Sequence, residues 1–360
     1  MLTCLSFNLT GRSADEITTK YRTLVENVLD DEAARELIGT WKLVWGPVVY
    51  ADSFIGAKTS VNSVLIASPS EHPEQVIIAI AGTNGNSLMG WMLEDFNVRE
   101  KYPWPYGTTA LKPHISKGIA YGLGKLQGLA EQSPADGPAV TVEDFLTGNP
   151  EITQIMVTGH SLGGALASVY SLYLEDTKSD WDTSGQTAIN CLTTASQTPG
   201  DEDFSTYYGE RLSDSTCRVW NSMDIVPHAF EEGMLAKIPA IYEPQIPSQQ
   251  RIENFIANLQ RETEGNLYRH ILPEVEGFPS SYMRLDDIAG EKYKTFVDFI
   301  NNVVNLIKKL DPFRSKSITG DVGFVVHALI QHIFPYFNYF KITEFIKIMC
   351  SPTTQSSDGK

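Results

Sequence analysis

The residues with the clearest chemical potential in this chain form the segment Gly159-His160-Ser161-Leu162-Gly163-Gly164. A serine in the pattern Gly-x-Ser-x-Gly is typical of a nucleophile at a sharp turn between a strand and a helix. An apolar run at 152–158 precedes the segment, and small and apolar residues at 162–176 follow it as an expected helix. A Cβ at Gly159 or Gly163 would crowd such a turn. The pattern therefore predicts Ser161 as a nucleophile that attacks an acyl carbon.

A carboxylate candidate follows a later strand-like run, 217–221. Asp224 lies just beyond that run and precedes the turn Ile225-Val226-Pro227. A nucleophilic serine needs an imidazole base and a carboxylate that orients this base and stabilises the imidazolium. In the α/β-hydrolase fold the three groups occur in the order Ser, Asp or Glu, His. Asp224 is therefore the predicted acid; the alternative is a carboxylate that only caps a turn.

The imidazole is harder to choose, because the chain has seven histidines. The chain order excludes the three that precede Ser161, and His228 is too tethered because it follows Asp224 by only four residues. The remaining candidates are His270, His327 and His332. The residue pattern alone does not separate them.

Two main-chain N–H groups are expected to stabilise the negative charge that develops on the substrate oxygen. Leu162 begins the helix that follows the serine, so its N–H and the positive end of the helix dipole point toward that charge. The second donor should come from a loop after a neighbouring strand. The segment Ala81-Gly82-Thr83-Asn84-Gly85 ends the apolar run 76–81, and the amide of Thr83 is the candidate.

Beyond these residues, several segments resemble the class 3 (fungal-type) lipase family. They are Gly82-Thr83-Asn84 with Trp91 and Glu94-Asp95-Phe96, His114-Ile115-Ser116-Lys117-Gly118, Asn221-Ser222-Met223-Asp224-Ile225-Val226-Pro227, and Gln331-His332-Ile333-Phe334-Pro335-Tyr336. The resemblance covers about 40–230 and 325–345. One departure is Ala81, which stands where the family usually has arginine before the oxyanion glycine.

The resemblance implies an α/β-hydrolase fold with a mostly parallel central sheet flanked by helices. The whole chain, 1–360, is then one domain, in which 84–97 is a lid and 235–320 is a helical insertion between the acid and the histidine. It also implies His332 as the general base, with His327 and His270 as the alternatives.

The same resemblance implies a lipase or carboxylesterase that hydrolyses triacylglycerols or other lipid esters through an acyl-enzyme. This chemistry uses no metal and no organic cofactor. Two alternatives share the same catalytic residues: a phospholipase A1, and an esterase of small esters such as feruloyl esters. A third alternative is a non-catalytic interaction module with the same fold.

The implied lid has an amphipathic composition. Leu88, Met89, Trp91, Met92 and Leu93 lie between polar and acidic flanks. Such a helix would cover its apolar side in water and expose it at a lipid–water interface. A packed surface helix is the alternative.

Alternating strand and helix patterns surround these motifs and predict a sheet with crossover helices. The expected strands are 41–50, 61–67, 76–81, 152–158, 189–194 and 217–221. The expected helices are 14–37 (one or two), 116–131, 162–176 and 291–310. The helix 291–310 is expected to face the core, and membrane binding is the alternative. A loop is expected at 132–139 and a disordered tail at 351–360.

Composition narrows the possible partners. The formal net charge of −16 disfavours nucleic acid and anionic membranes, which would repel the chain. The sequence as written shows no signal peptide and no apolar run of about 18 residues that predicts a transmembrane helix. A secreted and a cytoplasmic location therefore both stay open.

The four cysteines do not form a metal or redox motif, because no two have Cys-x-x-Cys spacing. Cys191 and Cys217 lie in or beside expected neighbouring strands. A disulfide between them and a pair of buried thiols are both considered.

Overall fold

The computed structural model describes residues 9–54, 57–81, 98–131, 138–283 and 318–342. Its central sheet has the strand order β1-β3-β4-β9-β10-β12, and β2 pairs with β3. The strands are β1 (Thr10–Gly11), β2 (Trp41–Phe54), β3 (Ala57–Pro69), β4 (Gln75–Ala81), β9 (Gln154–His160), β10 (Ala188–Thr194) and β12 (Thr216–Val219).

The sheet is mixed rather than uniformly parallel. Strands β4, β9, β10 and β12 run parallel, and β1, β2 and β3 pair antiparallel. Short connections explain the antiparallel part, because β2 and β3 are separated only by residues 55–56, and β3 and β4 by 70–74. A parallel pair needs a crossover of a dozen or more residues. The strands expected from the sequence are all present.

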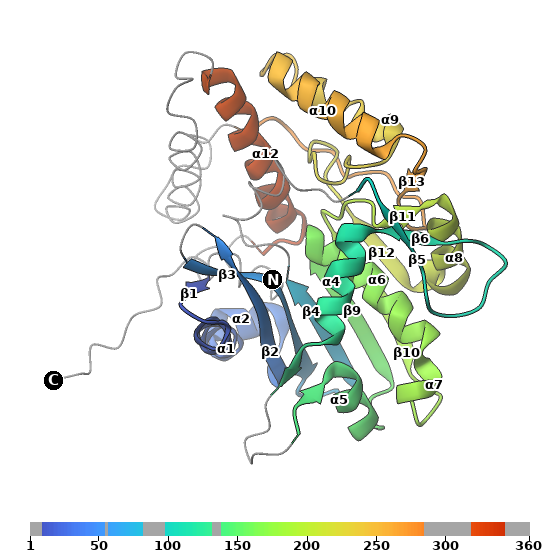
Figure 1. Ribbon diagram of the computed structural model, residues 1–360. Helices are drawn as coiled ribbons and strands as arrows, with labels where there is room; N and C mark the ends of the chain where they lie inside the picture. The colour runs from blue at the N-terminus through green and yellow to red at the C-terminus, as the bar shows by residue number, and fades with distance from the viewer. Residues whose placement is uncertain (1–8, 55–56, 82–97, 132–137, 284–317, 343–360) are drawn as a thin grey trace.

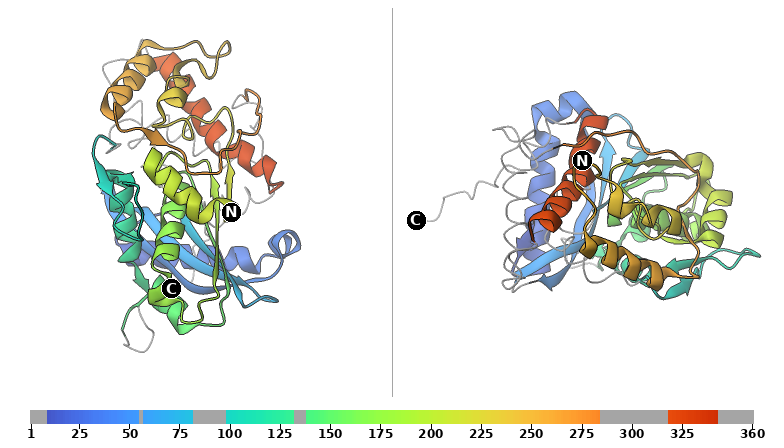
Figure 2. Two further views of the ribbon diagram at one scale, coloured as in Figure 1. Left: turned by 90° about the vertical axis from the view of Figure 1, so that its right-hand side faces the viewer. Right: turned by 90° about the horizontal axis from the view of Figure 1, so that it is seen from above.

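Helices cover both faces of the sheet (Figures 1 and 2). On one face lie α1 (Ala14–Asp30) and α2 (Glu32–Ile38); on the other lie α4 (Lys117–Gln127), α5 (Val142–Gly148), α6 (Leu162–Asp176), α7 (Lys178–Trp181) and α8 (Glu202–Leu212). Alternate residues of β3 serve the two layers: Leu65 packs with the α1 side, and Ile66 packs with the α6 side. This two-sided burial is why the strands are apolar throughout.

A third group of helices lies at the end of the sheet where β9 meets α6 (Figure 1). It consists of α9 (Glu232–Leu235), α10 (Gln250–Thr263) and α12 (Ile318–Tyr339), with the short 3-10 helix η3 (Ile238–Ala240). Tyr242 and Leu259 share a buried apolar cluster with Phe324 and Ala328, so α10 and α12 pack together. Another 3-10 helix, η2 (Ser213–Ser215), precedes β12.

Two small sheets complete the described structure. One has the order β13-β11-β6-β5, with β5 (Lys101–Pro103), β6 (His114–Ser116), β11 (Gly200–Asp201) and β13 (Tyr268–Arg269); the other pairs β7 (Ala130–Glu131) with β8 (Val140–Thr141). The helix expected over 116–131 therefore ends earlier, at Gln127. Its last residues pair instead as a strand.

Both expectations for the cysteine pair are wrong. Cys191 and Cys217 are free, and Cys191 is buried while Cys217 is exposed. Cys217 pairs with Leu192, and Cys191 pairs with Thr216. Because successive strand side chains point to opposite faces, this offset of one residue directs the two thiols to opposite sides of the sheet.

Among the described residues, no helix has the length and apolar character needed to cross a bilayer. The lid segment 84–97, most of the expected loop 132–139, the helix 291–310 and the tail 351–360 lie outside the described residues.

Candidate active site

Ser161 lies in a strained turn between β9 and α6. Its φ is 61° and its ψ is −130°, a conformation that residues with a side chain rarely adopt. Hydrogen bonds from the N–H groups of Gly164 and Ala165 to the Ser161 carbonyl begin the helix, and the Ser161 N–H donates to the carbonyl of Thr194 at 2.9 Å. The serine is thus tied to both the helix and the neighbouring strand β10, as expected for a strained residue that carries function.

The glycines of this turn are required by close approach of the backbone. A Cβ at Gly159 would lie 1.9 Å from the carbonyl oxygen of Gly163. A Cβ at Gly164 would lie 3.0 Å from both the Thr194 oxygen and the Ser196 Cβ. Only glycine fits at Gly159, and the second glycine lets α6 approach β10 closely.

Asp224 and His332 form a buried pair although they are 108 positions apart. The Nδ1 of His332 lies 2.9 Å from Oδ2 and 3.0 Å from Oδ1 of Asp224. The Asp224 side chain is fully buried, and His332 is 2% exposed. Of the three histidines that the residue pattern left open, His332 is the one hydrogen-bonded to the Asp224 carboxylate.

Helix α12 brings two donors to the same carboxylate. His332 and Tyr336 are four residues apart, so they share one helix face. The Tyr336 hydroxyl donates to Asp224 Oδ2 at 2.8 Å and accepts the N–H of Asn221 at 3.0 Å. The buried Asn221 amide donates in turn to Gln331 Oε1 at 2.8 Å, which fixes the segment of Asp224 to α12.

Sequence reasoning assigned no role to Tyr336, Asn221 or Gln331, although all three occur in the motifs that carried the family resemblance. The spacing of His332 and Tyr336 was the available signal. Without knowing that 318–339 is helical, that spacing does not show that both side chains reach one carboxylate.

The other late histidines make different contacts. His228 bonds through Nδ1 to the main-chain oxygen of Asp224 at 2.8 Å, in agreement with its expected tether. His270 bonds through Nε2 to the carbonyl of Pro227 at 2.6 Å, and His327 bonds through Nδ1 to the carbonyl of Met283 at 3.0 Å. Burial lowers the pKa of all three, that of His327 to about 4.

The two atoms that would exchange a proton both lack a hydrogen-bond partner among the described residues. The Oγ of Ser161 and the Nε2 of His332 are buried and have no hydrogen-bond partner among the described residues. The ring of His160, the residue next to Ser161, lies 4.8 Å from the ring of His332. This contact brings the turn and the Asp224–His332 pair into one site at the end of the sheet.

The sequence profile of the class 3 lipases matches residues 78–234, which include the turn and Asp224. This part of the chain is therefore similar to class 3 lipases. Together with the M37 lipase structure, the match confirms the resemblance, the fold class and the enzyme class that the sequence predicted: a lipase-like serine ester hydrolase of the α/β-hydrolase fold. No curated protein sequence matches the chain.

Several solved lipase structures align with this chain, and M37 lipase shares its fold. M37 lipase aligns over 97% of this chain and 94% of its own, with a TM-score of 0.76 and 25% sequence identity. The triacylglyceride lipase of Rhizomucor miehei aligns over 58% of this chain and 68% of its own, with a TM-score of 0.40 and 19% identity. Lipase II of Rhizopus niveus aligns over 63% and 78%, with a TM-score of 0.40 and 16% identity.

Of the two residues expected as oxyanion donors, the structure describes only Leu162. Leu162 is the first residue of α6, so its N–H has no carbonyl partner within the helix. Thr83 lies outside the described residues, as does the lid segment. The segment that begins at His114 was one of those that resemble the family. Its contact is structural, because His114 Nδ1 lies 3.2 Å from the buried carboxylate of Asp201.

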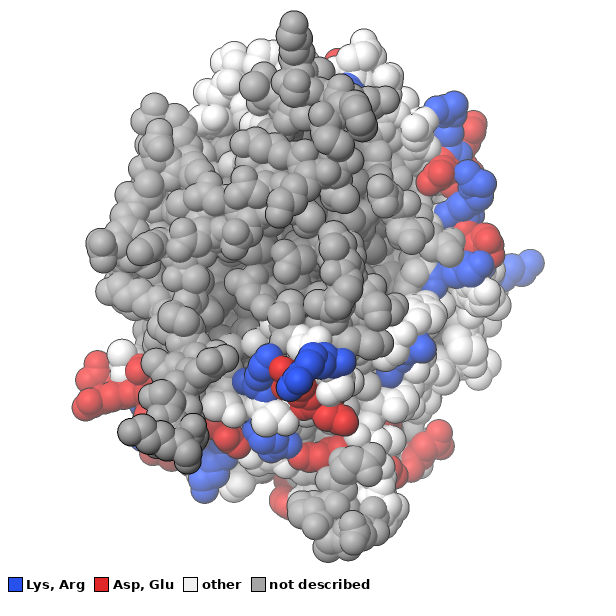
Figure 3. All heavy atoms as spheres, turned by 60° about the vertical axis from the view of Figure 1, so that its left-hand side comes forward, with Lys and Arg blue, Asp and Glu red and all other residues white. Residues whose placement is uncertain are grey.

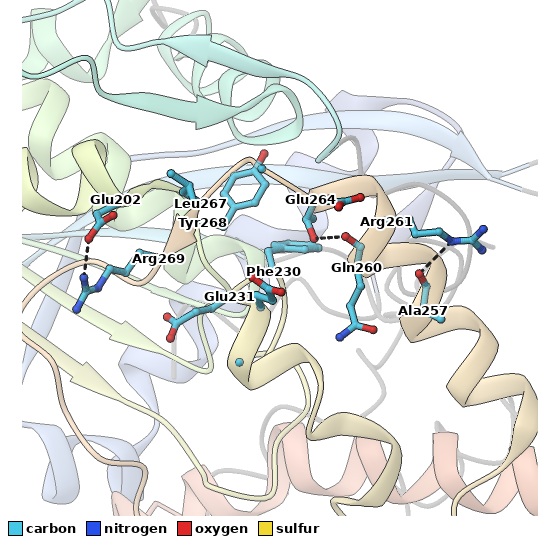
Figure 4. A pocket seen from close by; sticks show the side chains of 14 residues that line it. Glu202, Phe230, Glu231, Ala257, Gln260, Arg261, Glu264, Leu267, Tyr268 and Arg269 are labelled. Atoms are coloured by element: carbon cyan, nitrogen blue, oxygen red, sulfur yellow. Dashed lines mark hydrogen bonds and ion pairs between the residues drawn. The ribbon is translucent and has the colours of Figure 1, made fainter.

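A large hollow elsewhere does not suit a neutral ester. It has a volume of about 690 Å³ and lies between α9, α10 and β13 (Figure 4). Its lining includes Glu202, Glu231, Glu232 and Glu264, and Arg269 is paired with Glu202 at 3.0 Å. A site for an apolar ester is expected to be mostly apolar.

Among the described residues, no cluster of His, Cys, Asp and Glu side chains has a metal-site arrangement. On the face shown in Figure 3, Lys and Arg side chains lie beside Asp and Glu side chains over the described part. The described part of that face therefore carries both charges.

Proposed function

We propose that this protein is a lipase that hydrolyses lipid esters, with Ser161 as nucleophile, His332 as general base and Asp224 as the acid. The observation that carries the proposal is the buried Asp224–His332 pair, at 2.9 Å, beside the strained turn of Ser161. A buried carboxylate bonded to Nδ1 leaves Nε2 of the same ring free to accept the serine proton.

In the first half of the reaction, His332 Nε2 takes the proton of the Ser161 hydroxyl as Oγ attacks the ester carbonyl carbon. The tetrahedral oxyanion accepts hydrogen bonds from the N–H of Leu162 and, in the proposal, from that of Thr83. Each such donor is worth about 3 kcal/mol of transition-state stabilisation. The ester C–O bond then breaks, and the imidazolium returns its proton to the leaving alcohol.

In the second half, His332 removes a proton from water, and the resulting hydroxide attacks the acyl-enzyme carbonyl. The Ser161–acyl bond breaks, and Ser161 recovers its proton from His332 as the carboxylic acid leaves. Throughout, Asp224 fixes the ring orientation and stabilises the imidazolium. These steps need only the three side chains, the N–H donors and water.

The proposed substrates are triacylglycerols or other lipid esters at a lipid–water interface. The support is the match of residues 78–234 to class 3 lipases and the sequence of 84–97, where apolar residues lie between polar and acidic flanks. An amphipathic lid of this composition gains free energy when its apolar side meets lipid instead of water.

The test is hydrolysis of p-nitrophenyl esters from acetate to laurate by the wild type and by Ser161→Ala, His332→Asn and Asp224→Asn. We expect kcat to fall by at least about 10³-fold in the Ser161 and His332 variants. Rates with a long-chain ester should rise as its concentration passes the solubility limit. A flat response across that limit would exclude the interfacial substrate while leaving ester hydrolysis standing.

Two further measurements separate the alternatives. His327→Asn tests the competing histidine on the same helix as His332. The matched control is His72→Asn, which changes an exposed side chain and should leave kcat unchanged. A serine-directed organophosphate should label the wild type and not Ser161→Ala. Absence of labelling and of hydrolysis in the wild type would support a non-catalytic module instead.

A further inference from the structure

His160 is a buried residue beside the site that the reaction does not use. Its ring lies 4.8 Å from the His332 ring at an interplanar angle of 44°, and it meets the Tyr336 ring edge-on at 5.4 Å. His160 therefore contacts both of the α12 side chains that bond to Asp224. It is also the chain neighbour of Ser161.

Thr194, at the end of β10, fixes this ring. Its Oγ1 is hydrogen-bonded to Nδ1 of His160 at 3.1 Å and to the carbonyl of Gly159 at 3.2 Å. The main-chain oxygen of the same residue accepts the Ser161 N–H at 2.9 Å. One residue thus anchors the nucleophile through its backbone and the His160 ring through its side chain.

From these contacts we propose that Thr194 and His160 form a positioning pair that sets the orientation of His332 relative to Ser161. The proposal rests on the proposed function, because it takes Ser161 and His332 as the reacting pair. His160 acts through His332 and needs no contact with the substrate.

The space around the His160 ring is not completely filled. The ring borders a mostly apolar hollow of about 380 Å³, whose lining includes Thr158, Leu192, Thr194 and Phe337. A side chain next to open volume has fewer neighbours to exclude other rotamers. The hydrogen bond to the Thr194 hydroxyl therefore adds a directional constraint to the packing of the ring.

The charge of His160 suits this role. Burial holds the pKa of His160 well below its usual value, and the neighbouring His332 acts in the same direction. His160 thus stays neutral while His332 gains and loses its proton. A neutral His160 ring places no like charge beside the imidazolium of His332.

The experiment compares kcat and KM for p-nitrophenyl butyrate in four variants: Thr194→Val, Thr194→Ser, His160→Phe and Thr158→Val. Thr194→Val keeps the shape of the side chain and removes the hydroxyl. Thr194→Ser restores the hydroxyl. His160→Phe keeps a flat ring without the anchor and leaves the Thr194–Gly159 bond intact. Thr158→Val, on the same face of β9, is the matched control.

We expect kcat to fall about 10- to 100-fold in Thr194→Val and His160→Phe, with KM unchanged, because a misplaced general base slows the chemistry and not the binding. Thr194→Ser and Thr158→Val should have wild-type kcat. The double variant of Thr194→Val and His160→Phe should be no slower than Thr194→Val, since Thr194→Val already removes the bond between Thr194 and His160.

Wild-type kcat in Thr194→Val or in His160→Phe would overturn the proposal, and so would a Thr194→Ser variant as slow as Thr194→Val. The proposed function fails in a different way, through an inactive wild type or an active Ser161→Ala. Melting temperatures within a few degrees of wild type exclude unfolding as the cause of a lower kcat.

Discussion

The proposed site is centred on the carboxylate of Asp224. It is fully buried, and an isolated charge there would be very costly. Three donors satisfy it: the Val226 N–H on Oδ1 at 3.0 Å, the Tyr336 hydroxyl on Oδ2, and the His332 ring. The site therefore depends on a hydrogen-bonded cluster more than on a single acid–base pair.

Tyr336→Phe is predicted to weaken this cluster while retaining the ring. The change removes one bond to Asp224 and leaves the Asn221 N–H without its acceptor. We expect a loss of about 1–3 kcal/mol in the free energy of unfolding, measured by urea denaturation. We also expect kcat to fall about tenfold, because the carboxylate that orients His332 is less constrained.

Tyr339→Phe is the matched control for this change. Tyr339 lies on the same helix, but its side chain is half exposed and its ring stacks on Phe278 at 4.6 Å. Phenylalanine preserves that stacking, so stability and kcat should stay at wild-type values. Equal effects of the two substitutions would show that the Tyr336 hydroxyl has no specific role.

At the scale of elements, the strand–turn–helix unit of β9 and α6 was predictable because its signals are local. Gly159, Ser161 and Gly163 lie within five positions, and the apolar run before them and the small residues after them identify the two elements. The strained φ of Ser161 and the contact that excludes a Cβ at Gly159 agree with that prediction.

The choice of histidine was not predictable from the residues alone. His327 and His332 both lie on α12 and are both buried, so the orientation of the helix determines which ring meets Asp224. That orientation depends on packing of α12 against α10 and on the Asn221–Gln331 bond, which joins positions 110 apart. Family resemblance supplied the choice of His332 that spacing could not.

Gly159→Ala is predicted to disrupt this turn. The added Cβ would meet rigid backbone at 1.9 Å from the Gly163 oxygen, and backbone atoms cannot move away as a side chain can. We expect a loss of several kcal/mol in stability and loss of ester hydrolysis. Thermal denaturation and the p-nitrophenyl butyrate assay measure the two effects.

Gly124→Ala provides the contrast within the same fold. Gly124 lies inside α4, and a Cβ there would have no heavy atom within 4 Å. Alanine favours helix over glycine by about 1 kcal/mol, so this variant should be at least as stable as the wild type and fully active. A Gly159→Ala variant with the stability of Gly124→Ala would show that the turn relaxes.

For the molecule as a whole, buried neutral histidines link stability to pH. His160, His228, His270 and His327 are buried, and burial lowers the pKa of each below the usual 6.5, that of His327 to about 4. In the unfolded chain these rings titrate near pH 6.5. Below that pH the unfolded chain therefore binds protons that the native protein does not, and the native protein loses stability as the pH falls.

The predicted result is a steep loss of stability between pH 7 and pH 5. Each such histidine contributes a slope of up to about 1.4 kcal/mol per pH unit in this window.

Urea denaturation at pH 7, 6 and 5 measures the slope of the free energy of unfolding against pH. His327→Gln should reduce this slope by the contribution of about one proton, since glutamine does not titrate. Carboxylates that protonate near pH 5 affect the wild type and the variant alike, so the difference between them isolates the histidine. Equal slopes in wild type and His327→Gln would mean that His327 is protonated equally in the native and unfolded states, contrary to its burial against Tyr242 and Tyr282.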